Sequence, residues 1–230
     1  MRAVYVTYYE NGTYPTKTVG PKFTATWQYD QGPESQPVHA FPNAKIEINE
    51  IVNASTVQLS NLTSMPVDIA WTYGSGDVVA STLDTSGLSD LELNSNVCFD
   101  MFLDSDPDKA ITTDNSTYEV MIWLGQFGLS TQPIGNTLGV KATKVVNETT
   151  FDLYDGENSN TGQKVFTWLA EGNTTDFVGN IGLLLDELSS YGGPTTSDYL
   201  GYIAFGSEAL YVTKNVTFSV SELSLDLQTS

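Results

Sequence analysis

The sequence predicts an all-β fold built from two packed antiparallel sheets, and three observations support this class. Turn signals such as "ENGT", "DQGPES", "GSGD" and "YGGP" recur along the 230 residues, with short strand-like segments between them. Several segments alternate apolar and polar residues, which is the period of a half-buried strand. No apolar run reaches the roughly 18 residues of a membrane-spanning helix. Many short strands at this spacing are typical of a sandwich or a barrel.

The strand-like segments are rich in β-branched and aromatic residues, which favour a pleated, half-buried surface. They cover residues 22–29, 44–51, 57–62, 67–74, 96–103, 117–126, 139–145, 149–156, 163–170, 199–207 and 216–227. The alternation in the last segment loses phase around Ser221 and Glu222, which indicates a β-bulge or a bend. The acidic segment 82–96 is interpreted as an excursion between two strands.

One segment has a helical period instead of a strand period. Its apolar residues form a single stripe with three- and four-residue steps: Phe177, Ile181, Leu184, Leu185 and Leu188. We therefore expect a helix at about 175–191, with Thr175 or Asp176 as its N-cap and Gly192 at its end. Such a helix can brace the convex face of the sandwich.

The composition excludes several function classes. The net charge of −19 and the pI near 4.1 argue against a nucleic-acid partner and against an anionic membrane surface. The chain has a single histidine, His39, which argues against a histidine-based triad or metal site and places that residue at the surface or at the rim of a site. The acidic run 104–114 does not match a calcium loop and predicts a solvated hairpin. We expect no metal and no organic cofactor.

Glycosylation signals point to the secretory pathway. The motif N-x-S/T occurs seven times, against about three expected by chance from the asparagine count. The acceptor residues are Asn11, Asn53, Asn61, Asn115, Asn147, Asn173 and Asn215. The single cysteine, Cys98, allows no intrachain disulfide and is interpreted as a buried, inert thiol. We expect a secreted, extracellular protein, although the opening "MRAVYVTYYENG" is not a signal peptide.

Three acidic residues stand inside apolar segments. Glu119 lies within "STYEVMIWLGQ" at 116–126, and strand alternation places it on one face with Met121 and Trp123. Asp100 lies in "NVCFDMFL", and Glu208 lies in "YIAFGSEALYV". Each acid alone is consistent with a solvated strand edge. Together they suggest glycoside cleavage, which needs one acid to protonate the leaving oxygen and a second carboxylate to attack or to activate water.

The order of these segments resembles glycoside hydrolase family 12, the small jelly-roll endo-β-1,4-glucanases. "NVCFDMFLDSD" followed by "TYEVMIWLGQFG" carries the likeness, and "QPIG", "FDLYDG", the helical segment and "FGSEALY" follow in the family's order. Upstream, "TWQYDQGPESQPVHAFPN" and "IAWTYGSGDVVAS" are similar to the family's tryptophan-containing strands. The likeness covers about residues 22–227. It implies a two-sheet β-jelly-roll with one packed α-helix and an open concave cleft.

The resemblance also implies roles for the intrusive acids. Glu119 corresponds to the nucleophile, Glu208 to the general acid/base, and Asp100 to the aspartate that assists the nucleophile. Glu119 is then ionised in the resting enzyme, Glu208 has a raised pKa, and Asp100 shares a proton or a hydrogen bond with Glu119. Six further residues complete the candidate site. Those expected to bind substrate are Trp123, Met121, Trp27, Trp71, Tyr73 and Pro133, while Trp168 is expected in the core.

Two departures from the family pattern stand out. The family's early stacking tryptophan has no counterpart, and Tyr8, Tyr9 or Tyr14 is a candidate to replace it. The segment "GSEALY" has Ser-Glu-Ala-Leu where the family has Thr-Glu-Pro-Phe, and loss of the proline is expected to loosen the loop that aims Glu208.

The sequence therefore predicts one catalytic jelly-roll domain over 1–230, with about 20 divergent or truncated residues at its N-terminus. We expect a monomeric, retaining endo-glucanase that cleaves internal β-1,4-glucosidic bonds of cellulose-like or mixed-linkage glucans. A xyloglucan-specific enzyme is one alternative. A non-catalytic glucan-binding or decoy protein on the same fold is the other.

Overall fold

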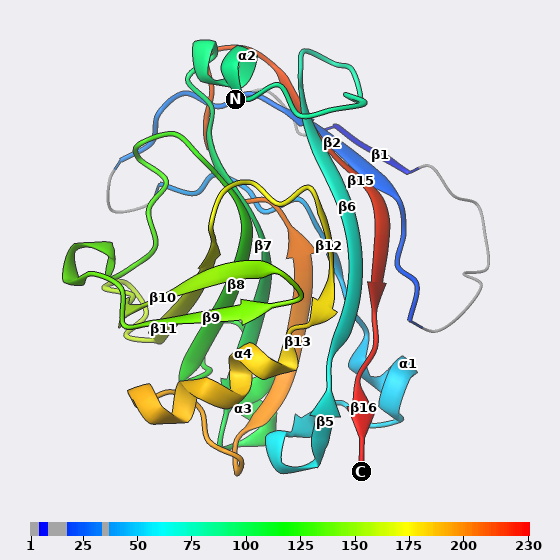
Figure 1. Cartoon of the computed structure of the whole chain (residues 1–230), viewed down its shortest axis with the longest axis vertical. Coiled ribbons are helices and arrows are strands. Elements are labelled where there is room, and N and C mark those ends of the chain that lie inside the picture. Colours follow the sequence, from blue (N-terminus) through cyan, green and yellow to red (C-terminus); the bar gives the residue numbers. More distant parts are fainter. Residues whose placement is uncertain (1–4, 9–17, 34–36) are drawn as a thin grey trace.

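The computed structural model describes residues 5–8, 18–33 and 37–230, which form two large sheets packed face to face (Figure 1). The five-stranded sheet has the order β1–β2–β15–β6–β12. Its strands are β1 (Tyr5–Tyr8), β2 (Phe23–Trp27), β6 (Pro66–Ser75), β12 (Asp176–Asn180) and β15 (Val216–Leu225). This architecture confirms the predicted all-β sandwich.

The nine-stranded sheet has the order β3–β13–β7–β8–β11–β10–β9, with β4 paired to β13 and β14 paired to β7. Its strands are β3 (Asn43–Lys45), β4 (Val57–Gln58), β7 (Asn94–Asp104), β8 (Tyr118–Phe127), β9 (Ala142–Val146), β10 (Thr149–Glu157), β11 (Lys164–Ala170), β13 (Tyr199–Gly206) and β14 (Ala209–Tyr211). A small ribbon pairs β5 (Leu62–Ser64) with β16 (Gln228–Thr229).

Among the strands that the structure describes, neighbours pair antiparallel except β8 and β11, which run parallel. In that parallel register Glu119 lies beside Val165, and Met121 lies beside Thr167. The expected bulge in β15 is confirmed, because the register with β6 shifts between Val220 and Glu222.

The central strands of the nine-stranded sheet are apolar on their inner face. On β8, Val120, Ile122 and Leu124 belong to the core between the sheets, as expected from strand alternation. Phe166 and Trp168 of β11 point to the same core. The alternate residues of both strands are left for the outer face of this sheet, which faces away from the five-stranded sheet.

The predicted helix at 175–191 is wrong for its first third. Residues 176–180 form β12, where Phe177 pairs with Ile69 of β6. Phe177 is buried while its neighbour Val178 is 54% exposed, so the strand pairing overrides the helical period. The helix itself is α4 (Gly182–Glu187), which continues into the 3-10 turn η3 (Leu188–Tyr191).

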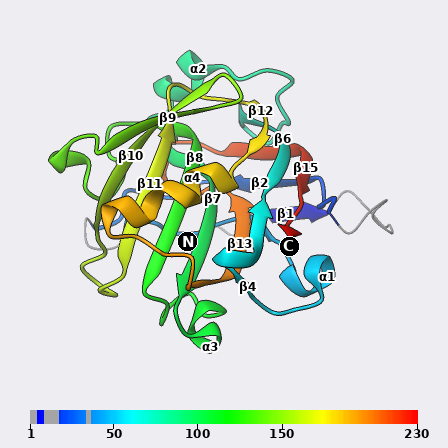
Figure 2. The same cartoon turned by 60° about the horizontal axis from the view of Figure 1, so that its bottom comes forward.

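Figure 2 shows α4 in front of strands β8 and β11. Trp168 anchors α4 to the inner face of β11, because its indole Nε1 donates to the carbonyl oxygen of Leu184 at 3.1 Å. The indole is fully buried, so its N–H needs such an acceptor. The helix therefore closes one side of the core between the sheets.

Short helical segments replace strand in two predicted runs. The segment 44–51 ends as strand at Lys45 and continues as α1, and 57–62 contains the turn η1 between β4 and β5. The segment 82–96 holds a helix, α2, whose N-cap Asp84 accepts from the backbone N of Gly87 at 3.0 Å. The bounds are α1 (Ile48–Val52), α2 (Thr85–Asp90), α3 (Pro107–Ala110), η1 (Leu59–Asn61) and η2 (Asn136–Leu138).

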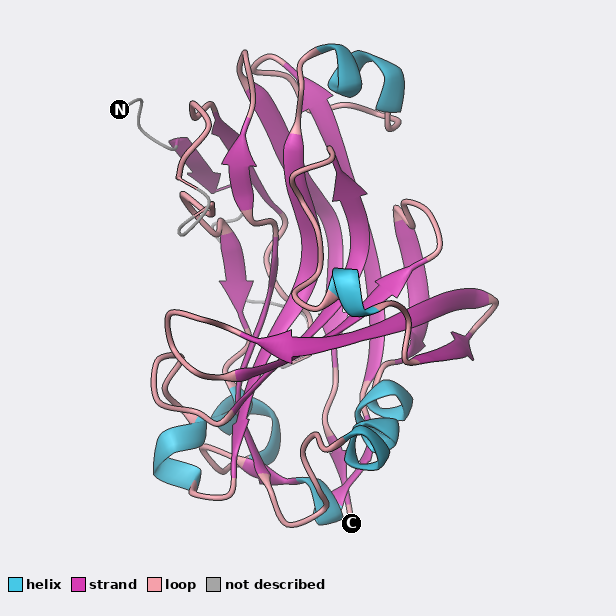
Figure 3. Cartoon of the chain, turned by 90° about the vertical axis from the view of Figure 1, so that its left-hand side faces the viewer, coloured by secondary structure: helices cyan, strands magenta, loops and turns pink. Residues whose placement is uncertain are grey.

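These helical segments lie mainly at the ends of the strands. Figures 1 and 3 show α1, α3 and α4 gathered at the end of the molecule near the C-terminus, and α2 at the opposite end. No helix in the described ranges is long and apolar enough to cross a membrane. Tyr9, Tyr14 and the sequon Asn11 lie outside the described residues, and only the strand backbone is described for Tyr8.

The inner residues of β8 pack in the core between the sheets, so truncating one of them should destabilise the protein strongly. Replacing Ile122, which is fully buried, by alanine should lower the free energy of unfolding by about 2–5 kcal/mol. The matched control is Val145→Ala on β9, where the side chain is 61% exposed and the change should stay within about 0.5 kcal/mol. Urea unfolding followed by tryptophan fluorescence measures both, and equal values would contradict the assigned faces.

Candidate active site

Glu119 opens onto a cavity of about 330 Å³ on the outer face of the nine-stranded sheet. Met121 and Trp123 line the same cavity, as the strand alternation predicts. Both are nearly buried, and the Trp123 indole Nε1 lies 3.5 Å from the sulfur of Met121. The β8 strand therefore presents an acid, a thioether and an indole in a row along one wall of this space, which we call the Glu119 cavity.

Glu208 reaches the Glu119 cavity from a different part of the sheet. It lies in the two-residue connection between β13, which ends at Gly206, and β14, which begins at Ala209. The structure thus brings together two acids that are 89 positions apart in the sequence and that the strand pattern could not place relative to one another.

The Asn96 side chain contacts both the side chain and the backbone of Glu208. The Asn96 amide Nδ2 donates to the Glu208 carboxylate oxygen Oε2, and the backbone N of Glu208 donates to Asn96 Oδ1 at 3.0 Å. Asn96 is fully buried on β7. Sequence reasoning missed this residue, although its position two and four residues before Cys98 and Asp100 gives the same alternation that marked Asp100.

The expectation of a loosened Glu208 loop is not supported by the backbone contacts. Because residue 209 is alanine rather than proline, its N–H is free to donate, and it bonds the carbonyl oxygen of Ala40 at 2.8 Å. The backbone N of Ser207 also donates to the carbonyl of Pro42 at 3.2 Å. The connection is therefore pinned on both sides of Glu208.

Asp100 shares the outer face with Glu119. It lies opposite Met121 on β8, which makes it a diagonal neighbour of Glu119, and it lies opposite Ala204 on β13. Its residue is only 9% exposed, and its Oδ1 has no hydrogen-bond partner among the described residues. Asp100 does not itself line the Glu119 cavity.

Burial opposes the ionisation of each of the three carboxyl groups. Burial, with added repulsion from Glu208, raises the pKa of Glu119 to about 7. Burial and the charges of both glutamates hold the pKa of Asp100 well above its usual range. Burial also raises the pKa of Glu208, while the bond from Asn96 lowers it. Asp100, which has no donor for its Oδ1, is the group most strongly kept neutral.

Two buried hydroxyls on the cavity wall also lack partners. Thr167 of β11 is 1% exposed and Thr131 is 2% exposed, and neither Oγ1 has a hydrogen bond among the described residues. Buried polar groups are normally paired. The rest of the wall includes the polar turn 157–160, which follows β10. The cavity thus presents apolar rings beside unpaired hydroxyls, which suits a ligand with both apolar faces and hydroxyl groups.

Three predicted substrate-binding aromatics do not lie in this cavity. Trp27, Trp71 and Tyr73 are at most 2% exposed and belong to the core between the sheets. Their strands, β2 and β6, form part of the five-stranded sheet, whose inner face carries them. The prediction that they bind substrate was wrong, because alternation gives the face of a strand but not the sheet to which the strand belongs.

Pro133 is buried and does not line the cavity, while its neighbours Gln132 and Ile134 do. His39 is exposed and stacks on Tyr29 with ring centroids 4.8 Å apart, close to the cavity-lining Val38, which agrees with a rim position. Cys98 is fully buried. Burial and the three nearby carboxylates hold the pKa of its thiol well above the usual range, so the thiol is inert.

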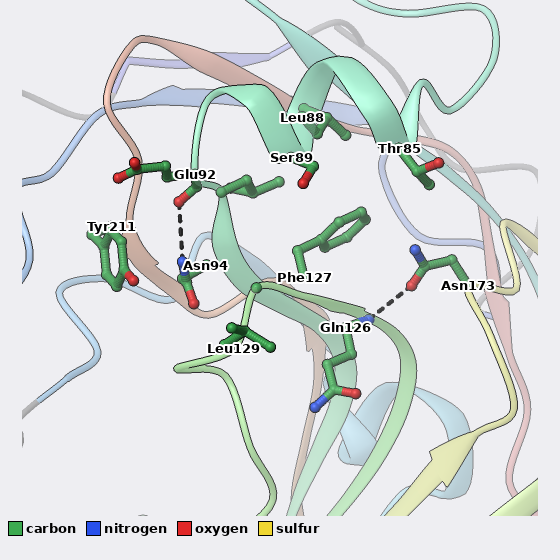
Figure 4. Close-up of a pocket in the computed structure, with 12 residues that line it drawn as sticks. Thr85, Leu88, Ser89, Glu92, Asn94, Gln126, Phe127, Leu129, Asn173 and Tyr211 are labelled. Carbon is green, nitrogen blue, oxygen red and sulfur yellow. Dashed lines mark hydrogen bonds between the residues drawn. The ribbon is translucent and has the colours of Figure 1, made fainter.

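A second cavity of about 400 Å³ lies beside α2 (Figure 4). Of the described residues that line it, Glu92 alone carries a carboxyl group, so it cannot supply two-carboxylate chemistry. The predicted glycosylation residue Asn173 borders it, and its Oδ1 accepts from the backbone N of Gln126 at 2.9 Å. Asn53, Asn61, Asn115 and Asn147 are exposed, while Asn215 is half-buried and donates to Asp77 at 2.8 Å.

Comparison with known proteins connects this geometry to a family. The sequence profile of "Glycosyl hydrolase family 12" matches residues 16–228. The chain is 30% identical over 203 residues to the "Xyloglucan-specific endo-beta-1,4-glucanase A" of Aspergillus niger, covering 88% of this chain and 71% of that protein.

Solved structures of that family share the fold. The endoglucanase 3 of Trichoderma harzianum superposes with a TM-score of 0.74 at 23% identity, covering 97% of this chain and 83% of the other. The catalytic domain of Humicola grisea Cel12A, in complex with a soaked thio-cellotetraose, gives a TM-score of 0.74 at 24% identity, covering 98% and 86%.

The raised pKa of Glu119 predicts a pH-dependent stability cost. Between the ordinary pKa of 4.5 and the folded value of about 7, the folded protein keeps a proton that the unfolded chain has lost, so stability falls as the pH rises. Glu119→Gln removes this cost. Its free energy of unfolding should exceed that of the wild type by up to about 3 kcal/mol near pH 8, and the difference should vanish near pH 4.

Urea titrations across this pH range measure the difference. Glu171→Gln, which neutralises an exposed acid that does not line the cavity, is the control. A Glu119→Gln protein that is no more stable than the wild type at the alkaline end would contradict the assigned electrostatics.

Proposed function

The chain belongs to glycosyl hydrolase family 12, and we propose that it hydrolyses internal β-1,4-glucosidic bonds of a glucan polymer with retention of configuration. The observation that carries this proposal is that Glu119 on β8 and Glu208 in the connection between β13 and β14 line one cavity. Retaining chemistry needs two carboxyl groups about 5–5.5 Å apart on either side of the scissile bond. The Glu119 cavity has a carboxyl group from each of these two residues on its wall.

In the first step, Glu119 acts as the nucleophile. Its carboxylate attacks the anomeric carbon while Glu208 donates its proton to the glycosidic oxygen, and the bond between that carbon and oxygen breaks. The leaving chain departs as an alcohol, and a glycosyl ester forms on Glu119. Burial raises the pKa of Glu208, which favours the protonated form that this step requires.

In the second step, Glu208 acts as the base. It takes a proton from water, the water oxygen attacks the anomeric carbon, and Glu119 leaves as a carboxylate. The ester has removed the negative charge of Glu119, so the repulsion between the two groups is gone. The amide of Asn96 then stabilises the carboxylate form of Glu208 through its bond to Oε2. One contact therefore favours the form that this step requires.

Asp100 has the role of a neutral neighbour. Its pKa lies well above its usual range, so the Asp100 carboxyl group keeps its proton and stays neutral. We assign to it the task of limiting the negative charge around Glu119. A charged group at this position would raise the pKa of Glu119 further and reduce the fraction able to attack.

The walls of the cavity suit a glucan. The rings and methyl groups of Trp123 and Met121 offer an apolar surface for a sugar face, and Thr131 and Thr167 offer hydroxyls for its edge. The relative from Aspergillus niger is named for xyloglucan, so we propose that polymer first, with cellulose-like and mixed-linkage glucans as alternatives. We further propose that the protein acts as a secreted monomer glycosylated at its sequons.

Replacing either acid should abolish hydrolysis. Glu119→Gln and Glu208→Gln should each release reducing sugar from xyloglucan or β-glucan at least about a hundredfold more slowly than the wild type, because each removes a group that takes part in bond cleavage. Glu171→Gln should retain wild-type activity. A wild-type protein that binds these polymers in affinity electrophoresis but releases no reducing ends would instead support the non-catalytic glucan-binding alternative.

The unpaired hydroxyl of Thr167 should serve substrate binding rather than folding. Thr167→Val keeps the shape of the side chain and removes a hydroxyl without a partner, so stability should be unchanged or slightly higher. The KM for the polymer should rise by about three- to tenfold at similar kcat, since a sugar hydroxyl loses its partner. The matched control is Ser219→Ala, which removes another buried, unpaired hydroxyl on β15 and should leave KM unchanged.

A further inference from the structure

A buried chain of hydroxyls joins the five-stranded sheet to the connection that carries Glu208. We propose that Tyr73 is a positioning residue that sets the aim of Glu208 from the opposite sheet. The proposal rests on the acid/base role proposed for Glu208. It gives a task to two residues, Tyr73 and Trp27, that sequence analysis had assigned to sugar binding.

The contacts run across the core without a break. Trp27 Nε1 donates to the Tyr73 hydroxyl at 3.0 Å, and that hydroxyl lies 2.7 Å from the Oγ of Ser207, the residue before Glu208. Ser207 Oγ donates to the backbone oxygen of Asn96. The last link is the Asn96 side chain, which holds the Glu208 carboxylate.

A second branch reaches the backbone of Glu208 itself. Ser95 Oγ lies 3.1 Å from the Tyr73 hydroxyl and 2.7 Å from Ser207 Oγ, and it donates to the carbonyl oxygen of Glu208 at 2.7 Å. Tyr73, Ser95, Asn96 and Ser207 are all fully buried. These groups are shielded from solvent, and hydrogen bonds are stronger in such a low-dielectric interior.

The donors of this network can all be used at once. Trp27 donates to Tyr73, Tyr73 donates to Ser207, Ser207 donates to the Asn96 carbonyl, and Ser95 donates to the Glu208 carbonyl. Burial raises the pKa of Tyr73 to about 12, although its hydrogen bonds lower it. Its hydroxyl therefore remains a donor over the whole pH range in which a glycosidase is assayed.

The position of the network explains why it would affect chemistry and not only stability. Ser207 is the single residue between the end of β13 and Glu208, so a shift of its Oγ is passed directly to the acid/base. Asn96 touches the carboxylate, and its own backbone oxygen is the acceptor for Ser207. Displacement of a catalytic group by about 1 Å can cost about a hundredfold in rate.

Tyr73→Phe tests the proposal, because it keeps the ring and removes the hydroxyl. The readout is kcat/KM for two aryl β-cellotriosides, one with a phenol leaving group that needs protonation and one with a 2,4-dinitrophenol leaving group that does not. A misaimed Glu208 should lower kcat/KM for the phenyl substrate by about tenfold or more and leave the dinitrophenyl value within about twofold. Ser207→Ala should give the same pattern.

Two further variants serve as controls, one for complete loss of the acid and one for loss of an unrelated hydroxyl. Glu208→Gln shows the full effect of losing the acid, with the same contrast between leaving groups. Ser219→Ala removes a buried hydroxyl outside the network and should change neither value. An equal loss on both substrates in Tyr73→Phe would mean a general structural defect and would overturn the proposal. So would wild-type values on both substrates, because the backbone contacts of the connection would then be sufficient.

Amide hydrogen exchange keeps the proposal separate from the proposed function. In Tyr73→Phe the amides of residues 206–211 should exchange at least about tenfold faster than in the wild type, while those of β8 remain unchanged. If the wild type hydrolysed no glycoside, the proposed function would fail, and the exchange data would still decide whether Tyr73 fixes this connection. Unchanged exchange at 206–211 would refute the positioning role.

Discussion

The burial of three carboxyl groups in one site is the constraint on which this site depends. Glu119, Asp100 and Glu208 each have a pKa raised by burial, and repulsion from neighbouring carboxyl groups raises the pKa of Glu119 and of Asp100 further. Such a cluster is costly to fold at neutral pH, and it is held only because the strands beneath it are firmly packed. The apolar inner residues of β8 and β11 supply that packing, so the same strands provide both stability and chemistry.

The two glutamates are held in different ways, and the difference fits their proposed roles. Glu119 projects from β8, a central strand of the nine-stranded sheet, and its position follows from the register of β8 with β7 and β11. Glu208 lies in a two-residue connection and depends on hydrogen bonds, chiefly from Asn96. A group that both gives and takes a proton gains from a neighbour such as Asn96, which stabilises one of its two forms without adding charge.

Strand alternation predicted the β sandwich and the shared face of Glu119, Met121 and Trp123, because both follow from local geometry. It could not say that Trp27 and Tyr73 belong to the far sheet, since the order of strands is set by pairings between distant segments. Phe177 shows a related limit: its apolar stripe suits a helix and a strand equally, and pairing with β6 decides. Asn96 carried no distinctive signal of its own. The role of Glu208 came from family resemblance, not from spacing.

The proposed retaining mechanism requires that Glu119 form a covalent bond to the sugar. Incubation with 2,4-dinitrophenyl 2-deoxy-2-fluoro-β-cellobioside, which forms such an ester rapidly and releases it slowly, tests this directly when followed by peptide mass spectrometry. We predict that one sugar adds to the protein and that the labelled peptide carries the modification on Glu119. A label on Asp100 or Glu208, or a protein that turns over glucan yet never acquires the label, would contradict the assignment of Glu119 as the nucleophile.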